Sequence, residues 1–302
     1  QRSFPYKQLR DENRRRGRNQ NEFELVHTGI FDDNRFFDLE VEYAKASPED
    51  VLIRFTITNR GPEKAALHLL PTLWFRNTWS WGENRKNNGS TPLLQLKDDR
   101  LVSSAVEGLG SYGLSCSEQG TWLFTENETN TQRLYNQPLK QPYVKDAFHR
   151  YLTEGKVDAV NPDQTGSKAA LHLQRNLEPG EVWQVNLRLC RHDSNGTAEQ
   201  ASVESAAMSS LIEQRRQDWQ DHLHWVAPDL NNEDRAIHAA AAAGLFWCRK
   251  FYNWYVSRWL RGDSNSAKPP EERWHTDTAY WRNLRARNII SMPDCWEYPY
   301  FC

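Results

Sequence analysis

Residues 23–192 carry the alternation of apolar and polar side chains that is typical of half-buried β-strands. The clearest run is 51–58, where apolar residues at every second position alternate with mostly polar ones, and a turn sequence follows at 59–62. The next apolar run, 65–75, is interrupted by Pro71. Because proline cannot donate a hydrogen bond to a neighbouring strand, we expect an edge strand or a bulge there.

Two further alternating runs, 169–173 and 183–189, flank the turn sequence Glu-Pro-Gly-Glu at 178–181. This pattern predicts a β-hairpin. Many short strands separated by such turns indicate a large antiparallel β-sandwich for this part of the chain.

Beyond Ser194 the hydrophobic period changes to three or four residues, which is typical of helices. We predict one helix over 198–225, preceded by a capping-box pattern, and a second helix over 232–261 that ends at Gly262. The second helix has an apolar stripe that would normally face partner helices. Without such partners the stripe predicts association and poor solubility. Its members are Ile237, Ala241, Leu245, Cys248, Tyr252, Tyr255 and Trp259.

Two shorter segments outside these helices also suggest local order. A short helix is predicted within 142–152. The polar and basic segment 5–18 predicts a solvated helix or loop that packs on the acidic residues Asp32 and Asp33.

Composition narrows the classes of function. The 302 residues include 38 Lys and Arg against 40 Asp and Glu, and this balance argues against a nucleic-acid partner, which requires a basic surface. No run of 18 apolar residues occurs, so no membrane span is expected. The 13 tryptophans either fill cores or present flat rings to a ligand, and the sequence leaves both interpretations open.

The five cysteines are dispersed and lack the spacing of a zinc site or a disulfide framework. We therefore expect free thiols in a reducing compartment such as the cytoplasm, with no metal and no other cofactor.

Gly108, Gly110 and Gly113 match the glycine pattern of dinucleotide-binding loops. That chemistry needs a helix directly after the glycines, so that amide groups at its start meet a pyrophosphate. The residues that follow, 114–120, are too polar and too short for such a helix. We interpret the segment as a loop between strands.

Two other segments are candidate ligand sites. In the segment 74–82, indole rings suit the apolar face of a sugar while Arg76 and Asn77 suit its hydroxyl groups, although the same rings could instead pack the sandwich against a neighbouring domain. In the segment 126–130, oxygen-bearing side chains follow a strand and could hold calcium or a sugar. A plain turn is the favoured interpretation of 126–130.

The last residues of the chain form a proline-bounded aromatic segment. Trp296, Glu297 and Tyr300 are candidates for the floor of a polar pocket, or alternatively for an interdomain contact.

Six segments of the chain resemble a single protein family. They are 14–18 (RRRGR), 28–33 (TGIFDD), 70–82 (LPTLWFRNTWSWG), 123–130 (LFTENETN), 143–149 (YVKDAFH) and 291–301 (SMPDCWEYPYF). These residues resemble the bacterial branch of glycoside hydrolase family 63, which includes relatives of processing α-glucosidase and mannosylglycerate hydrolase. The tryptophan-rich and closing segments are the specific parts of this likeness, which runs over nearly the whole chain.

The resemblance implies a fold that is mainly a β-sandwich followed by α-helices. It places an N-terminal antiparallel super-sandwich at 1–192, a linker helix at 193–230, and the first helices of an incomplete (α/α)6 barrel at 231–302. It also implies hydrolysis of α-glucosides or α-mannosides with inversion, and a carbohydrate substrate as the partner, with no nucleic acid and no membrane. Inversion requires one carboxylic acid and one carboxylate, roughly 6.5–9.5 Å apart.

In the family the acid is an aspartate in a Trp-Asp pair shortly after the Trp-Glu-Tyr-Pro segment, and the base is a glutamate far downstream. We therefore expect this chain to begin inside the sandwich and to stop before both catalytic positions. The chain departs from the family at Cys295 and Cys302. No catalytic residue is assigned here, and Trp296, Glu297 and Tyr300 are expected to shape a sugar subsite.

The alternatives are a non-catalytic carbohydrate-binding or scaffold module, and a glycoside phosphorylase, for which we find no phosphate-binding pattern in the sequence.

Overall fold

The computed structural model describes residues 4–77, 79, 91–106, 109–192, 205–262 and 268–291. The chain divides into two compact units. The first unit comprises Gln1–Asn77 and Thr91–Ile212, and the second comprises Thr78–Ser90 and Glu213–Cys302.

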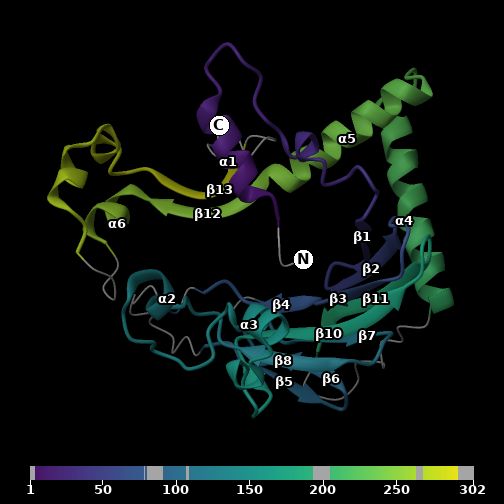
Figure 1. The fold of residues 1–302 in the computed structure, drawn as a ribbon, viewed down its shortest axis with the longest axis horizontal. Helices are drawn as coiled ribbons and strands as arrows, with labels where there is room; N and C mark the ends of the chain where they lie inside the picture. Colours follow the sequence, from purple (N-terminus) through teal and green to yellow (C-terminus); the bar gives the residue numbers. More distant parts are fainter. Residues whose placement is uncertain are drawn as a thin grey trace. The chain divides into compact units, whose positions relative to one another are not determined.

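Two antiparallel sheets build the first unit (Figure 1). Among the described residues the larger sheet has seven strands, in the order β1 (Phe37–Ser47), β2 (Asp50–Asn59), β11 (Val182–Arg191), β7 (Tyr112–Cys116), β6 (Arg100–Ser103), β5 (Leu94–Lys97) and β9 (Thr165–Gly166). The smaller sheet has four, with β10 (Lys168–Leu177) between β8 (Thr121–Thr125) on one side and β3 (Ala65–Leu69) and β4 (Thr72–Trp74) on the other.

The core of the first unit draws side chains from both sheets. Ile57 and Val185 of the larger sheet and Phe124, Leu171 and Leu177 of the smaller one belong to a single buried cluster. Because successive side chains of a strand point to opposite faces, one face of each sheet enters this cluster. The predicted antiparallel sandwich is therefore confirmed.

The predicted hairpin at 178–181 is wrong. β10 and β11 are consecutive strands, but β10 pairs with β3, β4 and β8, whereas β11 pairs with β2 and β7. The turn is therefore an arch that carries the chain from one sheet to the other. An arch and a hairpin both place alternating apolar residues against a core, so the pattern of residues alone does not separate them.

The interruption predicted at Pro71 is confirmed. β3 and β4 follow each other along the same side of β10, and the gap between them contains Pro71. The carbonyl oxygen of Pro71 accepts a hydrogen bond from the backbone N–H of Leu171 at 3.0 Å, so the edge stays attached to β10 across the break.

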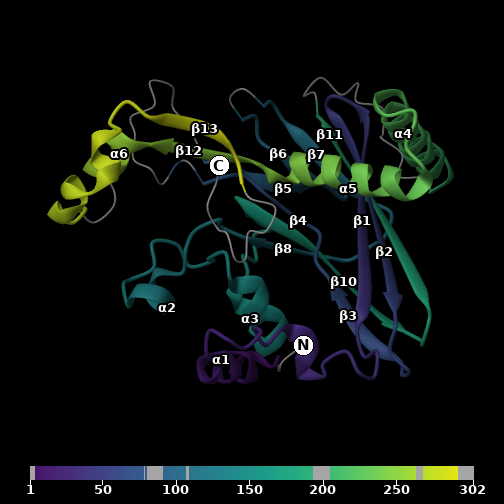
Figure 2. The same ribbon diagram turned by 90° about the horizontal axis from the view of Figure 1, so that it is seen from above.

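Short helices accompany the sandwich. They are α1 (Tyr6–Arg15), η1 (Leu25–Thr28), α2 (Thr131–Tyr135), α3 (Ala147–Glu154) and η3 (Val157–Ala159). α3 confirms the short helix expected near 142–152, and it lies beside the smaller sheet (Figure 2) through Phe148, which packs against Leu123 and Ala170.

α1 confirms a helix in the basic segment, but its contacts are not those expected. Asn13 exchanges two hydrogen bonds with the backbone of Phe23. Asp33 forms an ion pair with Arg35 rather than with a residue of α1.

The helix expected over 198–225 corresponds to α4 (Ser205–Val226), and residues 198–204 lie outside the described part. Its first turns pack on the outer face of the larger sheet, where Met208 and Ile212 join Ala44 and Leu52 in a small buried cluster.

The helix expected over 232–261 is only partly correct. α5 (Asn232–Cys248) ends early, and β12 (Arg249–Tyr255) then pairs with β13 (Arg285–Ile290) in a two-stranded ribbon, followed by α6 (Val256–Arg261) (Figure 1). The sequence of β12, RKFYNWY, is rich in aromatic residues that favour strands, and pairing with β13 satisfies backbone groups that a helix would have satisfied internally.

Two 3-10 helices, η4 (Glu271–His275) and η5 (Asp277–Tyr280), lie between α6 and β13. Ala279 of η5 packs against Val256 and Leu260 of α6 and thereby gives this end of the second unit its own small core. In the part of the chain that the structure describes, no helix has the length and apolar character needed to cross a bilayer.

Candidate functional site

An exposed tryptophan stands on the outer face of the smaller sheet. Leu73 of β4 points into the core, so its neighbour Trp74 points outward, and its side chain is 54% exposed. Lys168 of β10 is the register partner of Trp74. We call Trp74, Lys168 and the nearby Phe148 of α3 the Trp74 surface.

The ammonium group of Lys168 joins the two aromatic rings of this surface. Its Nζ lies 4.9 Å from the ring centroid of Phe148 and 6.0 Å from that of Trp74. It also donates a hydrogen bond of 2.8 Å to the carbonyl oxygen of Lys145. An ammonium group over aromatic faces is attracted by the negative π-surface, so the lysine is held in place.

Burial is the main cause that lowers the pKa of Lys168, and the positive charge of Lys145 lowers it further, while Asp146 acts in the opposite direction. A lowered pKa makes the ammonium a stronger hydrogen-bond donor, because its proton is held less tightly. The Trp74 surface therefore combines a flat apolar ring with a directed N–H donor.

The carboxylates near this surface are engaged in holding loops. Asp146 accepts hydrogen bonds from the amide of Asn130, at 3.1 and 3.2 Å, and pairs with Arg133 at 3.1 Å. Glu126 accepts from both the backbone N–H and the hydroxyl of Ser167. These contacts fit structural acceptors better than a catalytic acid and base.

Asn77 also serves the loop structure. Its side-chain amide donates to the carbonyl oxygen of Asn127 at 2.9 Å, and the amide of Asn127 donates to the carbonyl oxygen of Phe75 at 2.8 Å. The expected role of Asn77 toward sugar hydroxyls is therefore not favoured, since its amide already donates a hydrogen bond that fastens the segment after β4 to the neighbouring loop. Arg76, the other hydroxyl-binding candidate, is likewise engaged with partners.

The segment 126–130 is irregular backbone between β8 and α2, which agrees with the favoured interpretation of a plain connection. Asn130 caps α2 by accepting a hydrogen bond from the backbone N–H of Arg133 at 3.0 Å. Oε2 of Glu126 also accepts hydrogen bonds from Ser167, so this segment does not resemble a calcium loop, in which several oxygen atoms face the ion. Within the described residues, no group of three or more His, Cys, Asp and Glu side chains is arranged to hold a metal ion.

The glycine pattern at 108–113 does not form a dinucleotide loop. Gly110 has a positive φ of 86° and closes a turn with Val106, while Gly113 lies inside β7. A strand, β7, begins at Tyr112 where a helix would be needed. The interpretation as a loop between strands is therefore confirmed for 109–111 only, because Gly113 itself belongs to β7. Gly108 lies outside the described residues.

Trp296, Glu297 and Tyr300, the residues expected to shape a sugar subsite, lie outside the described residues. Their role stays a prediction. Sequence reasoning singled out Trp74 from the aromatic segment 74–82 but missed Lys168 and Phe148. The alternation of the strand that begins at Lys168 could have placed that lysine on the outer face, but no local pattern pairs it with Trp74.

Comparison with known proteins identifies a similar yeast protein. No family model matches the chain. Uncharacterized protein YMR196W of Saccharomyces cerevisiae is 33% identical over an alignment of 339 residues, which covers 99% of this chain and 31% of the yeast protein. The chain thus spans about a third of the length of the curated relative that it matches.

Proposed function

We propose that this chain is part of an inverting α-glycoside hydrolase of the family 63 type, which acts on α-glucosides or α-mannosides. In this proposal the sandwich presents the Trp74 surface to carbohydrate. The helices that follow the sandwich are the first of an (α/α)6 barrel, and the acid and base lie outside the 302 residues.

The observation that carries the proposal is the exposed indole of Trp74 beside the ammonium group of Lys168. The C–H face of a pyranose packs against an indole, and an adjacent N–H donor binds a ring hydroxyl. The six sequence segments that resemble the family and the antiparallel sandwich ahead of the helices agree with this role. The yeast relative is about three times longer than the matched region, which leaves room in such a protein for a separate catalytic domain.

Catalysis is assigned outside the described residues for a chemical reason. An inverting site needs two carboxyl groups with space between them for a water molecule. Two carboxylates beside the Trp74 surface already accept hydrogen bonds from protein donors, Asp146 through both of its oxygens and Glu126 through Oε2.

Binding tests the role of the surface. We expect the 302-residue chain to bind maltotriose in isothermal titration calorimetry, and the Trp74→Ala variant to bind it about 5- to 10-fold more weakly, the loss expected for one ring contact of about 1–1.4 kcal/mol. Trp225→Ala is the matched control. Trp225 is 78% exposed, belongs to the last turn of α4 and is not part of the Trp74 surface. Equal affinity of the Trp74→Ala variant and the parent chain would contradict the assignment.

Turnover tests the reaction. A longer protein that contains these residues is expected to hydrolyse p-nitrophenyl α-glucoside or α-mannoside and to release the β-anomer first, as seen by proton NMR. The 302 residues alone are expected to be inactive. Hydrolysis by the 302 residues would refute the placement of the catalytic groups, and binding without turnover by the longer protein would favour a carbohydrate-binding module instead.

A further inference from the structure

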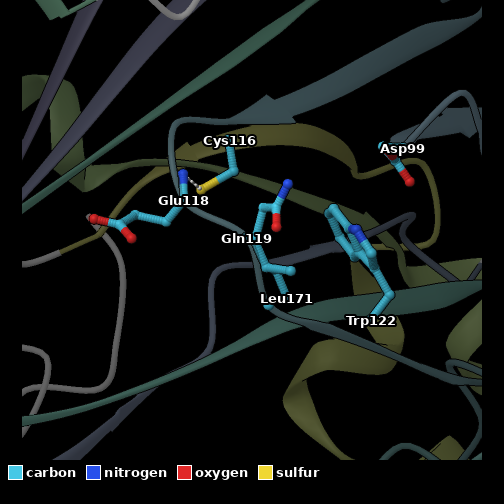
Figure 3. Close-up of a pocket in the computed structure, with 7 residues that line it drawn as sticks. Asp99, Cys116, Glu118, Gln119, Trp122 and Leu171 are labelled. Carbon is cyan, nitrogen blue, oxygen red and sulfur yellow. Dashed lines mark hydrogen bonds between the residues drawn. The ribbon is translucent and has the colours of Figure 1, made fainter.

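A pocket of about 410 Å³ lies at one end of the sandwich, in the first unit. Two turns and two strands meet there. They are the β5–β6 turn with Asp99, the β7–β8 turn with Cys116 to Gly120, and the neighbouring strands β8 and β10 (Figure 3). Trp122 of β8 and Leu171 of β10 are register partners and contribute the apolar part of the lining.

The indole of Trp122 is held in place by the core of the sandwich. It packs against the core cluster on the inner face of the smaller sheet, whereas Trp74 points from the opposite face of the same sheet. The pocket and the Trp74 surface are therefore separate places on the molecule.

The β7–β8 turn is held in one shape. The backbone N–H of Glu118 donates to the sulfur of Cys116 at 3.5 Å, and the indole N–H of Trp183 donates to the carboxylate of Glu118 at 3.3 Å. A Cβ at Gly120 would lie 2.6 Å from the carbonyl oxygen of His172, so only glycine lets the turn approach β10 this closely. The polar rim of the pocket is consequently preorganised.

The β5–β6 turn carries an unusual aspartate. Asp98 and Asp99 both have positive φ, 50° and 58°, in the two-residue turn between Lys97 and Arg100. Asparagine or aspartate is usual at the first position of such a turn and glycine at the second, because a Cβ is disfavoured where φ is positive. Asp99 keeps a strained backbone and brings a carboxylate to the pocket, which is the kind of outlier that accompanies binding sites.

The lining selects the chemistry of a ligand. The seven lining residues include two carboxylates and one amide but no basic side chain, so the pocket disfavours phosphates and other anions. Burial raises the pKa of the Cys116 thiol to about 11, so this side chain is a neutral apolar contact. In Figure 3 Asp99 and Trp122 lie next to each other on the right, and Gln119 lies between Trp122 and Cys116. The carboxylate of Glu118 points to the left, away from the indole of Trp122.

We propose that this pocket is a second carbohydrate site, which binds a single uncharged pyranose. Its volume falls in the range of small-molecule sites. The sugar ring lies on Trp122, Asp99 accepts hydrogen bonds from ring hydroxyls, and Gln119 both donates and accepts. An organic cation fits less well, since only one of the two carboxylates is on the indole side.

The test uses the 302-residue chain that carries Trp74→Ala, so that the Trp74 surface does not contribute. Saturation-transfer NMR with methyl α-glucoside and methyl α-mannoside is expected to show binding of at least one of them. Asp99→Gly and Gln119→Ala are each expected to weaken it at least tenfold. Glycine suits the positive φ of residue 99, and Gln119 is exposed, so both variants keep the fold. Gln184→Ala, an exposed glutamine on β11, is the matched control.

Absence of any methyl glycoside binding, or unchanged binding by the Asp99→Gly and Gln119→Ala variants, would overturn the proposal. Saturation transfer to tetramethylammonium that is lost in the Asp99→Gly variant, with no transfer to either methyl glycoside, would identify the pocket as a cation site instead. The outcome is independent of the hydrolase proposal, because a pocket that binds sugar in the Trp74→Ala chain stands even if the Trp74 surface binds none.

Discussion

A small buried cluster attaches α4 to the sandwich. Because the cluster has few members, the loss of unfolding free energy on truncating one of them can be calculated. Ile212 is 3% exposed and packs with Met208 of α4 and with Ala44 and Leu52 on the outer face of the larger sheet. Beside the cluster, the guanidinium of Arg54 donates to the hydroxyl of Ser209 at 2.7 Å and to the side-chain oxygen of Asn186 at 3.1 Å. The apolar cluster and this polar bridge together hold the start of α4.

Replacing Ile212 by alanine removes three buried carbon atoms. At about 0.8 kcal/mol for each, and with a further cost for the cavity left behind, the variant loses about 2–4 kcal/mol of unfolding free energy. Ile212→Val removes a single methyl group and costs about 0.5–1.5 kcal/mol. For a unit of roughly 200 residues, the alanine variant is expected to melt about 4–16 °C lower.

Thermal melts followed by circular dichroism measure this difference, and hydrogen exchange with mass spectrometry locates it. Peptides from the first turns of α4 are expected to lose protection before those of β10. Ile237→Ala is the matched control, since Ile237 lies on helix α5 and is 63% exposed. If Ile212→Ala lowers the melting temperature no more than Ile237→Ala does, α4 does not depend on this cluster and the reasoning fails.

Two further predictions concern titratable groups. Burial raises the pKa of Cys116 from the usual 9.0 to about 11, so its thiolate fraction at pH 8 is about 100-fold smaller than that of an ordinary cysteine. Peptide mapping should therefore show correspondingly slow alkylation of Cys116 by iodoacetamide. Labelling as fast as in the unfolded chain would contradict this. His172 stacks on His68, with a nitrogen of each ring 2.8 Å apart, and burial first, then the neighbouring imidazole, lowers the pKa of His172 below 6.5. The unfolded chain therefore takes up this proton at a higher pH than the folded chain, so stability is complete above about pH 6.5 and declines as the pH falls. Denaturation midpoints measured from pH 7.5 to pH 5 should fall less steeply for His172→Gln than for the parent chain, and parallel slopes would refute the role of this ring.

The sequence was sufficient for the features that depend on local pattern. Alternation in 51–58 identified β2, and the inability of Pro71 to donate a hydrogen bond identified the break between β3 and β4. Both follow from the side-chain period and the backbone chemistry of single residues.

Features that depend on pairing between segments distant in the chain could not be predicted from local sequence patterns. Whether β10 and β11 form a hairpin or belong to different sheets is decided by their partners β8 and β2. Cys190 of β11 pairs with Asp50 of β2, which lies 140 residues earlier in the chain. Likewise, 249–255 is a strand because 285–290 pairs with it. The site follows the same rule: Trp74 was visible as part of an aromatic segment, whereas its neighbour Lys168 is brought to it only by the register of the sheet.

The order of strands in the larger sheet has a consequence for biosynthesis. β1 and β2 form a local hairpin, but the other edge of β2 pairs with β11, which begins at Val182. About 120 residues must therefore be translated between Asn59 and Val182, which takes about 6–24 s at about 5–20 residues per second. For that interval the nascent chain displays a row of unsatisfied amide and carbonyl groups, a template for aggregation. The yield of folded protein in a cell consequently depends on what shields this edge while the ribosome is still at work.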